Sequence, residues 1–99
     1  MALRIRLTPR ALDDLERIKS YLLQHSARGA DSVRTDIRRT VRTIARHPGI
    51  GRPMDIDGLR RTTTVRYAYV VYYAVRGPNL VVVHVRHGSR AAPGAEELT

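Results

Sequence analysis

Two β-prone runs near the C-terminal end constrain the fold of this chain most strongly. Residues 67–75 and 80–87 are rich in valine and tyrosine, and they flank the short connection Gly77-Pro78-Asn79. Two such runs joined by a tight turn predict a β-hairpin. The second run leads into Arg86-His87-Gly88-Ser89-Arg90. The predicted sheet therefore presents cationic and titratable side chains at one edge, which suits contact with phosphate or with acidic protein.

The N-terminal half predicts one strand and two helices. Apolar residues alternate with arginine over residues 3–7, as in a strand with one buried face. Thr8-Pro9 offers an N-cap and a first-turn proline for a helix that ends near residue 25. A turn is expected over residues 26–31. Apolar side chains at helical spacing then predict a second helix, which ends before Pro48.

The rest of the chain predicts a loop and three consecutive strands. Glycine, proline and aspartate over residues 48–58 are typical of a loop, and residues 59–66 predict a partly exposed strand ahead of the hairpin. The sequence therefore predicts an α+β fold. An N-terminal strand, an antiparallel two-helix hairpin and a three-stranded antiparallel meander form one mainly antiparallel sheet. Residues 1–99 are expected to form one domain, with a flexible tail over residues 91–99.

The composition narrows the possible functions. The chain has 99 residues, with 18 Lys and Arg against 9 Asp and Glu, a formal net charge of +9, and no cysteine, phenylalanine or tryptophan. Disulfides, thiolate nucleophiles and Cys-ligated zinc are therefore excluded. The core should be aliphatic, with tyrosines at its margin keeping their hydroxyl groups in water. No apolar run reaches the ~20 residues of a membrane span, and early arginines break the pattern of a signal peptide. No membrane contact is expected, and the protein is placed in the cytoplasm.

No metal or cofactor site is predicted. His84 and His87 are three residues apart on the expected strand, so their side chains should point to opposite faces. The acidic residues fall early in the first helix, in the loop and at the tail, and they do not form the paired carboxylates of a hydrolase. Any chemistry would therefore depend on basic side chains.

Candidate functional side chains are cationic and lie on or beside the predicted sheet. Such a set can bind phosphate. With a histidine that titrates near neutral pH it can also support RNA cleavage without a metal, and the residues alone leave both possibilities open. The residues predicted to contact a target or phosphate are Arg52, Arg60, Arg61, Arg66, Arg86, His87 and Arg90. If the protein cleaves RNA, the predicted catalytic residues are His87, Arg61, Arg66 and Arg90.

The order of several short motifs resembles the RelE/ParE superfamily of bacterial toxins. The resemblance covers about residues 3–90. The motifs are Ala11-x-x-Asp14-Leu15-x-x-Ile18-x-x-Tyr21, His47-Pro48, Gly51-Arg52, Leu59-Arg60, Tyr69-Val70-Val71-Tyr72-Tyr73 and Val83-x-Val85-x-His87-x-x-Arg90. Proteins of this superfamily are the toxins of type II toxin-antitoxin modules, and a disordered segment of the antitoxin wraps the toxin. The resemblance therefore implies a cognate antitoxin as partner.

An acidic antitoxin segment also suits the residues themselves. The net charge would attract it, and it could fold against the helical hairpin or add to a sheet edge. The residues predicted to bind the antitoxin are Arg34, Arg38, Arg42 and Tyr21.

Two mechanisms occur in the superfamily that the chain resembles. RelE-like members are ribosome-dependent mRNA endoribonucleases, whereas ParE-like members inhibit DNA gyrase. No tyrosine follows Tyr73, and residues 48–58 carry one arginine where RelE-like proteins are lysine-rich. The His-Pro-x-x-Gly-Arg and His-x-x-Arg signatures also resemble ParE. The expected function is gyrase inhibition by a protein that is not an enzyme. A ribosome-dependent ribonuclease and a plain basic nucleic-acid-binding domain are the alternatives.

Overall fold

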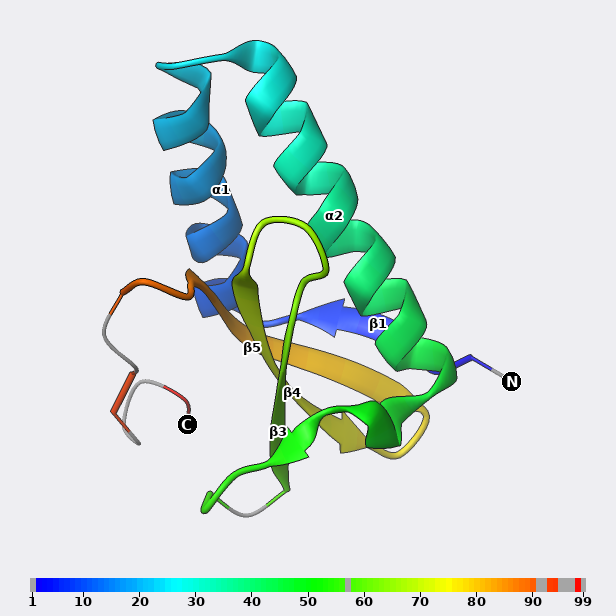
Figure 1. The fold of residues 1–99 in the computed structure, drawn as a ribbon. Coiled ribbons are helices and arrows are strands. Elements are labelled where there is room, and N and C mark those ends of the chain that lie inside the picture. Colours follow the sequence, from blue (N-terminus) through cyan, green and yellow to red (C-terminus); the bar gives the residue numbers. More distant parts are fainter. Residues whose placement is uncertain (1, 57, 91–92, 95–97, 99) are drawn as a thin grey trace.

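The chain folds into a five-stranded sheet with two helices packed on one of its faces (Figure 1). The computed structural model describes residues 2–56, 58–90, 93–94 and 98. In chain order the elements are β1 (Arg4–Leu7), α1 (Pro9–Leu23), α2 (Ala27–Arg46), the 3-10 helix η1 (Pro48–Ile50), β2 (Arg52–Pro53), β3 (Leu59–Thr63), β4 (Tyr69–Arg76) and β5 (Asn79–His87). None of the helices described is long and apolar enough to cross a membrane.

The sheet is mixed but mainly antiparallel. Its strands lie in the order β1-β5-β4-β3-β2, with β1 parallel to β5 and each of the other pairs antiparallel. The predicted hairpin is the β4–β5 pair, which begins with Arg76 opposite Asn79 and ends with Tyr69 opposite His87. The predicted α+β fold with one mainly antiparallel sheet is therefore confirmed.

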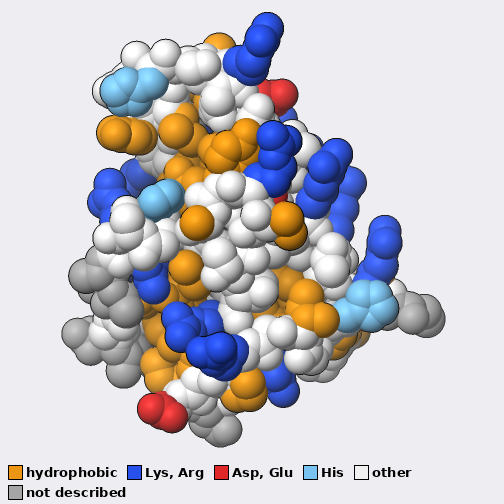
Figure 2. Space-filling view, viewed as in Figure 1, with side chains coloured by type: hydrophobic (Ala, Val, Ile, Leu, Met, Phe, Trp, Pro, Cys, Tyr) orange, Lys and Arg blue, Asp and Glu red, His pale blue; other side chains and the backbone are white. Residues whose placement is uncertain are grey.

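Side-chain caps fix where both helices begin. The Thr8 hydroxyl accepts a hydrogen bond from the backbone N–H of Ala11 at 3.1 Å, as the sequence predicts for α1. The Ser26 hydroxyl accepts one from the N–H of Gly29 at 3.0 Å, so α2 begins at Ala27. The predicted turn over residues 26–31 is therefore wrong, because the serine cap allows the helix to start ahead of Gly29. Figure 2 shows that Lys and Arg side chains project from the surface along α2.

Two further boundaries differ from the prediction. The loop expected over residues 48–58 contains η1 and the short strand β2, which pairs with β3 at the sheet edge. The strand expected over residues 59–66 ends at Thr63, and the chain then turns through Ala68, which has a φ of 57°. The main body of each predicted strand is otherwise present.

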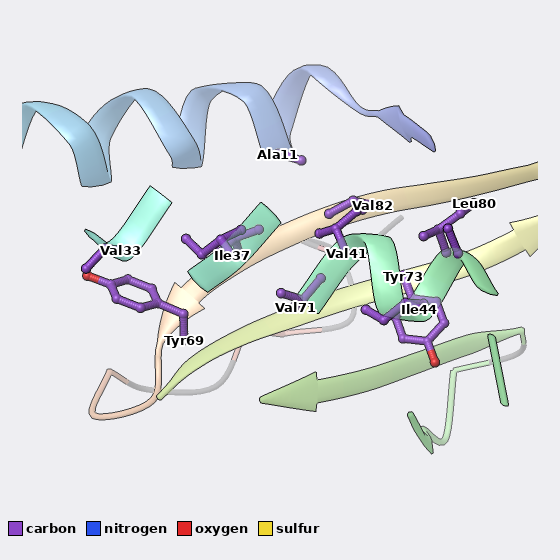
Figure 3. Packing of buried hydrophobic residues seen from close by; sticks show 12 residues of the cluster. Ala11, Val33, Ile37, Val41, Ile44, Tyr69, Val71, Tyr73, Leu80 and Val82 are labelled. Atoms are coloured by element: carbon purple, nitrogen blue, oxygen red, sulfur yellow. The ribbon is translucent and has the colours of Figure 1, made fainter. Parts of the chain in front are cut away.

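The main core lies between the helices and the sheet (Figure 3). Val33, Ile37 and Ile44 from α2 pack against the sheet residues Val71 and Val82. Tyr69 and Tyr73 also point into this core, as alternation along β4 predicts, whereas Val75 on the same face is 40% exposed.

The hydroxyl groups of two tyrosines contradict the prediction that they would stay in water. Tyr73 is 0% exposed, and Tyr72 on the other face of the sheet is 1% exposed. The Tyr73 hydroxyl donates to the carbonyl of Pro48 at 2.7 Å and accepts from the N–H of Gly51 at 2.9 Å. Backbone groups of the η1 segment therefore replace water around this hydroxyl, which lets the whole ring enter the core.

A smaller apolar cluster lies on the sheet face that the helices leave open. Its buried members are Leu59, Val70, Tyr72, Ala74 and Leu98. Leu98 belongs to the predicted flexible tail, residues 91–99, of which residues 93–94 and 98 are described. Residues 91–92, 95–97 and 99 lie outside the described part of the chain, so the expected flexibility stays a prediction.

Candidate functional site

The sheet separates the seven cationic residues that the sequence predicts as a target or phosphate site. Arg61 lies opposite Tyr72, whose side chain belongs to the open-face cluster. His87 lies opposite Tyr69, whose side chain belongs to the core under the helices. Residues directly opposite each other in a sheet share a face. Arg61 and His87 therefore lie on opposite faces, and the seven residues do not form one cluster.

Two of these arginines have contacts that stabilise the fold locally. Arg60 Nη1 donates to the carbonyls of Gly51 at 2.7 Å and Gly49 at 3.4 Å, which ties η1 to the sheet. The Arg66 guanidinium lies over the ring of Tyr67, 5.4 Å from its centre, in the connection between β3 and β4. Arg52 is exposed on the edge strand β2, opposite Arg61.

The other three cationic residues follow one another closely at the end of β5. Arg86 Nε donates to the Tyr72 hydroxyl at 2.7 Å, and Nη1 donates to the carbonyls of Arg90 at 2.8 Å and His87 at 3.2 Å. His87 Nδ1 lies 2.7 Å from the Ser89 hydroxyl and accepts from the Ser89 N–H at 3.1 Å. These contacts fold residues 86–90 into a turn. Arg86 lies opposite Val70 and so shares the open face with Tyr72, whereas His87 lies opposite Tyr69 on the face that the helices cover.

These residues border a hollow between α1 and the end of β5, which we call the α1–β5 groove. Its volume is about 630 Å³. β1 pairs with β5 only as far as Leu7 opposite Val82. On that side the following part of β5 has no strand beside it, and α1 packs against β5 there instead. The groove is lined by Arg10, Asp14, Arg17, Ile18, Tyr21, Leu22, Tyr69, His84, Val85, Arg86, His87, Ser89 and Arg90.

A buried carboxylate forms one wall of the α1–β5 groove. Asp14 Oδ2 lies 2.6 Å from His84 Nδ1 and accepts from the backbone N–H of Val85 at 3.0 Å. Asp14 Oδ1 accepts from Arg10 Nε at 3.2 Å. The Asp14 side chain is 10% exposed and that of His84 is 7% exposed. The aspartate thus satisfies a strand N–H that β1 is too short to reach, and its charge is balanced within the wall.

A second buried carboxylate holds the neighbouring loop. Asp36 on α2 accepts from the N–H of Tyr67 at 3.0 Å and from the N–H of Arg66 at 3.2 Å. Asp14 and Asp36 were both missed as candidates from the sequence, because an aspartate in a helix normally faces solvent. The sequence did contain a signal that these aspartates are buried, because each one directly precedes an apolar residue of its helix. Asp14 precedes Leu15, and Asp36 precedes Ile37.

The residues predicted to bind an antitoxin lie on two different surfaces. Arg34 and Arg38 border a second hollow of about 640 Å³ between the helices, which we call the interhelix groove. Leu15, Ile18, Leu22, Val33 and Ile37 contribute to its apolar lining. Arg42 is exposed further along α2. Tyr21 borders the α1–β5 groove instead, where it is 57% exposed.

The titratable residues give no support for a metal site or for a tyrosine acting as base. Within the described residues, no three His, Cys, Asp or Glu side chains are placed to hold a metal ion. Burial raises the pKa of Tyr69 above its ordinary value, although the nearby charge of Arg90 partly opposes this. Tyr69 therefore remains protonated at neutral pH.

Solved structures of two kinds of bacterial toxin share this fold. A chain of the chromosomal ParDE toxin-antitoxin system from P. aeruginosa has a TM-score of 0.74 and 22% identity, over 87% of this chain and 96% of that one. A mutant of E. coli toxin RelE in the free state has a TM-score of 0.65 and 14% identity, over 90% and 86% of the two chains. A chain of the RelBE2 toxin-antitoxin complex from Mycobacterium tuberculosis has a TM-score of 0.60 and 20% identity, over 88% and 99%. The architecture is thus that of the RelE/ParE toxins.

The family follows from the sequence itself. A family model described as the ParE toxin of the type II toxin-antitoxin system parDE matches residues 5–92. The chain therefore belongs to the ParE toxin family, which confirms the predicted resemblance to the RelE/ParE superfamily and its closer similarity to ParE. A search of curated protein sequences found no significant match.

Proposed function

We propose that this protein is a toxin that arrests growth in the cytoplasm by inhibiting DNA gyrase and that a cognate acidic antitoxin neutralises it. Membership of the ParE family over residues 5–92 is the observation that carries this proposal. The separation of the predicted catalytic residues by the sheet supports a protein that inhibits by binding rather than by catalysis.

A ribonuclease mechanism is less compatible with this geometry. General acid–base catalysis requires its groups within hydrogen-bond reach of one reacting site, about 3 Å. Arg61 and His87 lie on opposite faces of the sheet, and Arg66 lies in the β3–β4 connection above α2. These residues therefore cannot surround one phosphate without rearrangement of the sheet.

The interhelix groove is the surface that best suits the antitoxin. Its apolar lining and the flanking Arg34 and Arg38 match an amphipathic helix that carries acidic side chains beside its apolar face. Leu23, at the end of α1, adds further exposed apolar surface to the groove, with 49% of its area accessible. The antitoxin would cover this surface when it folds on the toxin.

The direct test uses purified toxin, gyrase and relaxed plasmid DNA. We expect the toxin to block supercoiling and to trap cleaved DNA on gyrase, and we expect His87→Ala to change this activity by less than about threefold. In cells, incorporation of labelled thymidine should fall before incorporation of labelled methionine. A ribonuclease would instead stop translation first, and the His87→Ala variant would lose toxicity by ~100-fold. These two results together would overturn the proposal.

A further inference from the structure

We infer that the α1–β5 groove binds a segment of single-stranded nucleic acid, with its phosphates on the arginines at the end of β5 and a base against Tyr21. The inference concerns this one groove and goes beyond gyrase inhibition, because it gives the toxin a direct contact with nucleic acid. Its biological role rests on the proposed function, whereas the binding itself can be measured without gyrase.

Charge is the first support for this ligand. Arg17, Arg86 and Arg90 border the groove, and Arg17 also pairs with the exposed Asp13 at 3.0 Å. The buried carboxylate in the wall, Asp14, is already paired with His84, the Val85 N–H and Arg10. The groove therefore carries an excess of positive charge that no buried carboxylate cancels. Phosphate groups of a nucleic-acid backbone would release counterions from this surface on binding.

Preorganisation of Arg86 is the second support. Its Nε and Nη1 donate to the Tyr72 hydroxyl and to three backbone carbonyls, those of residues 87, 88 and 90. The guanidinium is therefore fixed before any ligand arrives, and little side-chain entropy remains to be lost on binding. Among the described residues, Arg86 Nη2 has no hydrogen-bond acceptor. Arg86 borders the groove from the open face of the sheet, where the groove crosses the edge of β5, so Nη2 is available to a phosphate oxygen at that edge.

Aromatic side chains distinguish this groove from other basic surfaces of the protein. Tyr21 borders the groove and is 57% exposed, with its ring edge-on to His25 at 5.0 Å. His87 packs edge-on against Tyr69 at 5.1 Å in the same groove. A basic groove with exposed rings is the usual arrangement for single strands, because every base can stack on an aromatic face. An acidic peptide would use the charges, whereas stacking on the Tyr21 ring is a contact that every base of a single strand can make.

The shape of the groove favours a single strand over a duplex. A hollow of about 630 Å³ has room for a nucleotide-sized ligand. Its floor includes His84 and Tyr69, which are 5% and 7% exposed. A duplex is convex and keeps its bases stacked, so it could touch the rim but could not reach this floor. An unpaired base can enter it.

The test measures binding of a fluorescein-labelled oligo(dT) of about 12 nucleotides, a length within the range covered by known single-strand sites. We expect the double variant Arg17→Gln/Arg90→Gln to bind at least tenfold more weakly and to reduce the salt dependence by about 1.4 in the log–log slope. The matched control, Arg39→Gln/Arg42→Gln, removes the same charge from exposed positions on α2 outside the groove. It should lose less than about threefold.

Tyr21 provides a second, uncharged test. Tyr21→Ala should weaken binding by about fivefold or more, whereas Tyr21→Phe keeps the ring and should bind like the wild type. Because the side chain is more than half exposed, neither change should disturb folding. Equal losses in the two arginine double variants, an unaffected Tyr21→Ala variant, or tighter binding of a duplex of the same length would each overturn the inference.

Two comparisons separate this inference from the proposed function. Oligo(dT) and oligo(rU) of equal length distinguish DNA from RNA as the source of the strand, and a preference for DNA agrees with a role at gyrase. Oligonucleotide binding in the groove without any inhibition of gyrase would support the groove and refute the proposed function. Gyrase inhibition by a wild-type toxin that does not bind either oligonucleotide would refute the groove alone.

Discussion

Replacing Asp14 with alanine should destabilise the protein far more than replacing its neighbour Asp13. Both aspartates lie on α1, and each pairs with an arginine one helical turn away, Asp14 with Arg10 at 3.2 Å and Asp13 with Arg17 at 3.0 Å. They differ in burial, since the Asp14 side chain is 10% exposed and the Asp13 side chain is 52% exposed. The pair of variants therefore compares a buried carboxylate, which also contacts His84 and the Val85 N–H, with an exposed one.

The magnitude follows from the groups that lose their acceptor. Asp14→Ala leaves the buried N–H of Val85 and the buried ring of His84 without the carboxylate, at about 1–3 kcal/mol each. The sum, about 2–6 kcal/mol, includes the usual effect of removing one partner of a buried charged pair, about 3–5 kcal/mol. Asp13→Ala removes an exposed pair worth about 0–1 kcal/mol. Replacing aspartate with alanine raises helix propensity by the same amount at both positions, so this stabilising effect cancels when the two variants are compared.

Urea denaturation followed by circular dichroism measures the difference directly. With a slope of about 2 kcal/mol per molar urea, the Asp14→Ala midpoint should lie about 2 M below that of Asp13→Ala. Asp14→Asn keeps an oxygen that can accept from the Val85 N–H but loses the charge, so its midpoint should fall between the two. Equal midpoints for the two alanine variants would refute the conclusion that the Asp14 carboxylate supports the end of β5.

Three further outcomes test other parts of the fold. Gly51→Ala should destabilise by about 1–3 kcal/mol, because its Cβ would lie 2.3 Å from the Tyr73 hydroxyl oxygen, whereas Gly49→Ala meets no atom within 4 Å and should be nearly neutral in the same urea assay. Burial raises the pKa of Tyr73, so the folded state holds its proton more tightly, and the contribution of this group to stability should be constant below about pH 10 and fall above it. Unfolding free energies unchanged between about pH 8 and 11 would contradict this. Asp36→Ala should cost about 2–4 kcal/mol and should speed amide hydrogen exchange in the β3–β4 connection, while Asp31→Ala at an exposed position of α2 should do neither.

Local signals in the sequence predict most of the fold because the structure uses them directly. Thr8 and Pro9 start α1 as capping rules require, and alternation along β4 places Tyr69 and Tyr73 in the core. The strand β2 could not be predicted in this way, because it has two residues and no periodicity. It forms only because β3 offers a free edge beside it.

The candidate site was less predictable, because it depends on contacts between elements that are distant in sequence. Strict alternation places His84 and His87 on opposite faces, yet both border the α1–β5 groove because the groove crosses the exposed edge of β5. Likewise, composition groups Arg61 with His87 as basic residues of one sheet, but only strand register shows which face each occupies. Register and edge exposure are tertiary properties, which periodicity along one chain segment does not contain.

The two buried aspartates explain how a basic surface can persist at the open end of the sheet. Beyond the end of β1, the backbone N–H groups on that edge of β5 have no neighbouring strand to accept their hydrogen bonds. A longer β1 would supply the acceptors, but it would also fill the α1–β5 groove. Asp14 satisfies the Val85 N–H from a helix instead, which leaves the space between α1 and β5 accessible. Asp36 acts in the same way on the β3–β4 connection. A carboxylate in these positions also lowers the repulsion among nearby arginines without occupying the surface that they line. The stability of this end of the sheet and the shape of its basic groove therefore depend on the same carboxylate, that of Asp14.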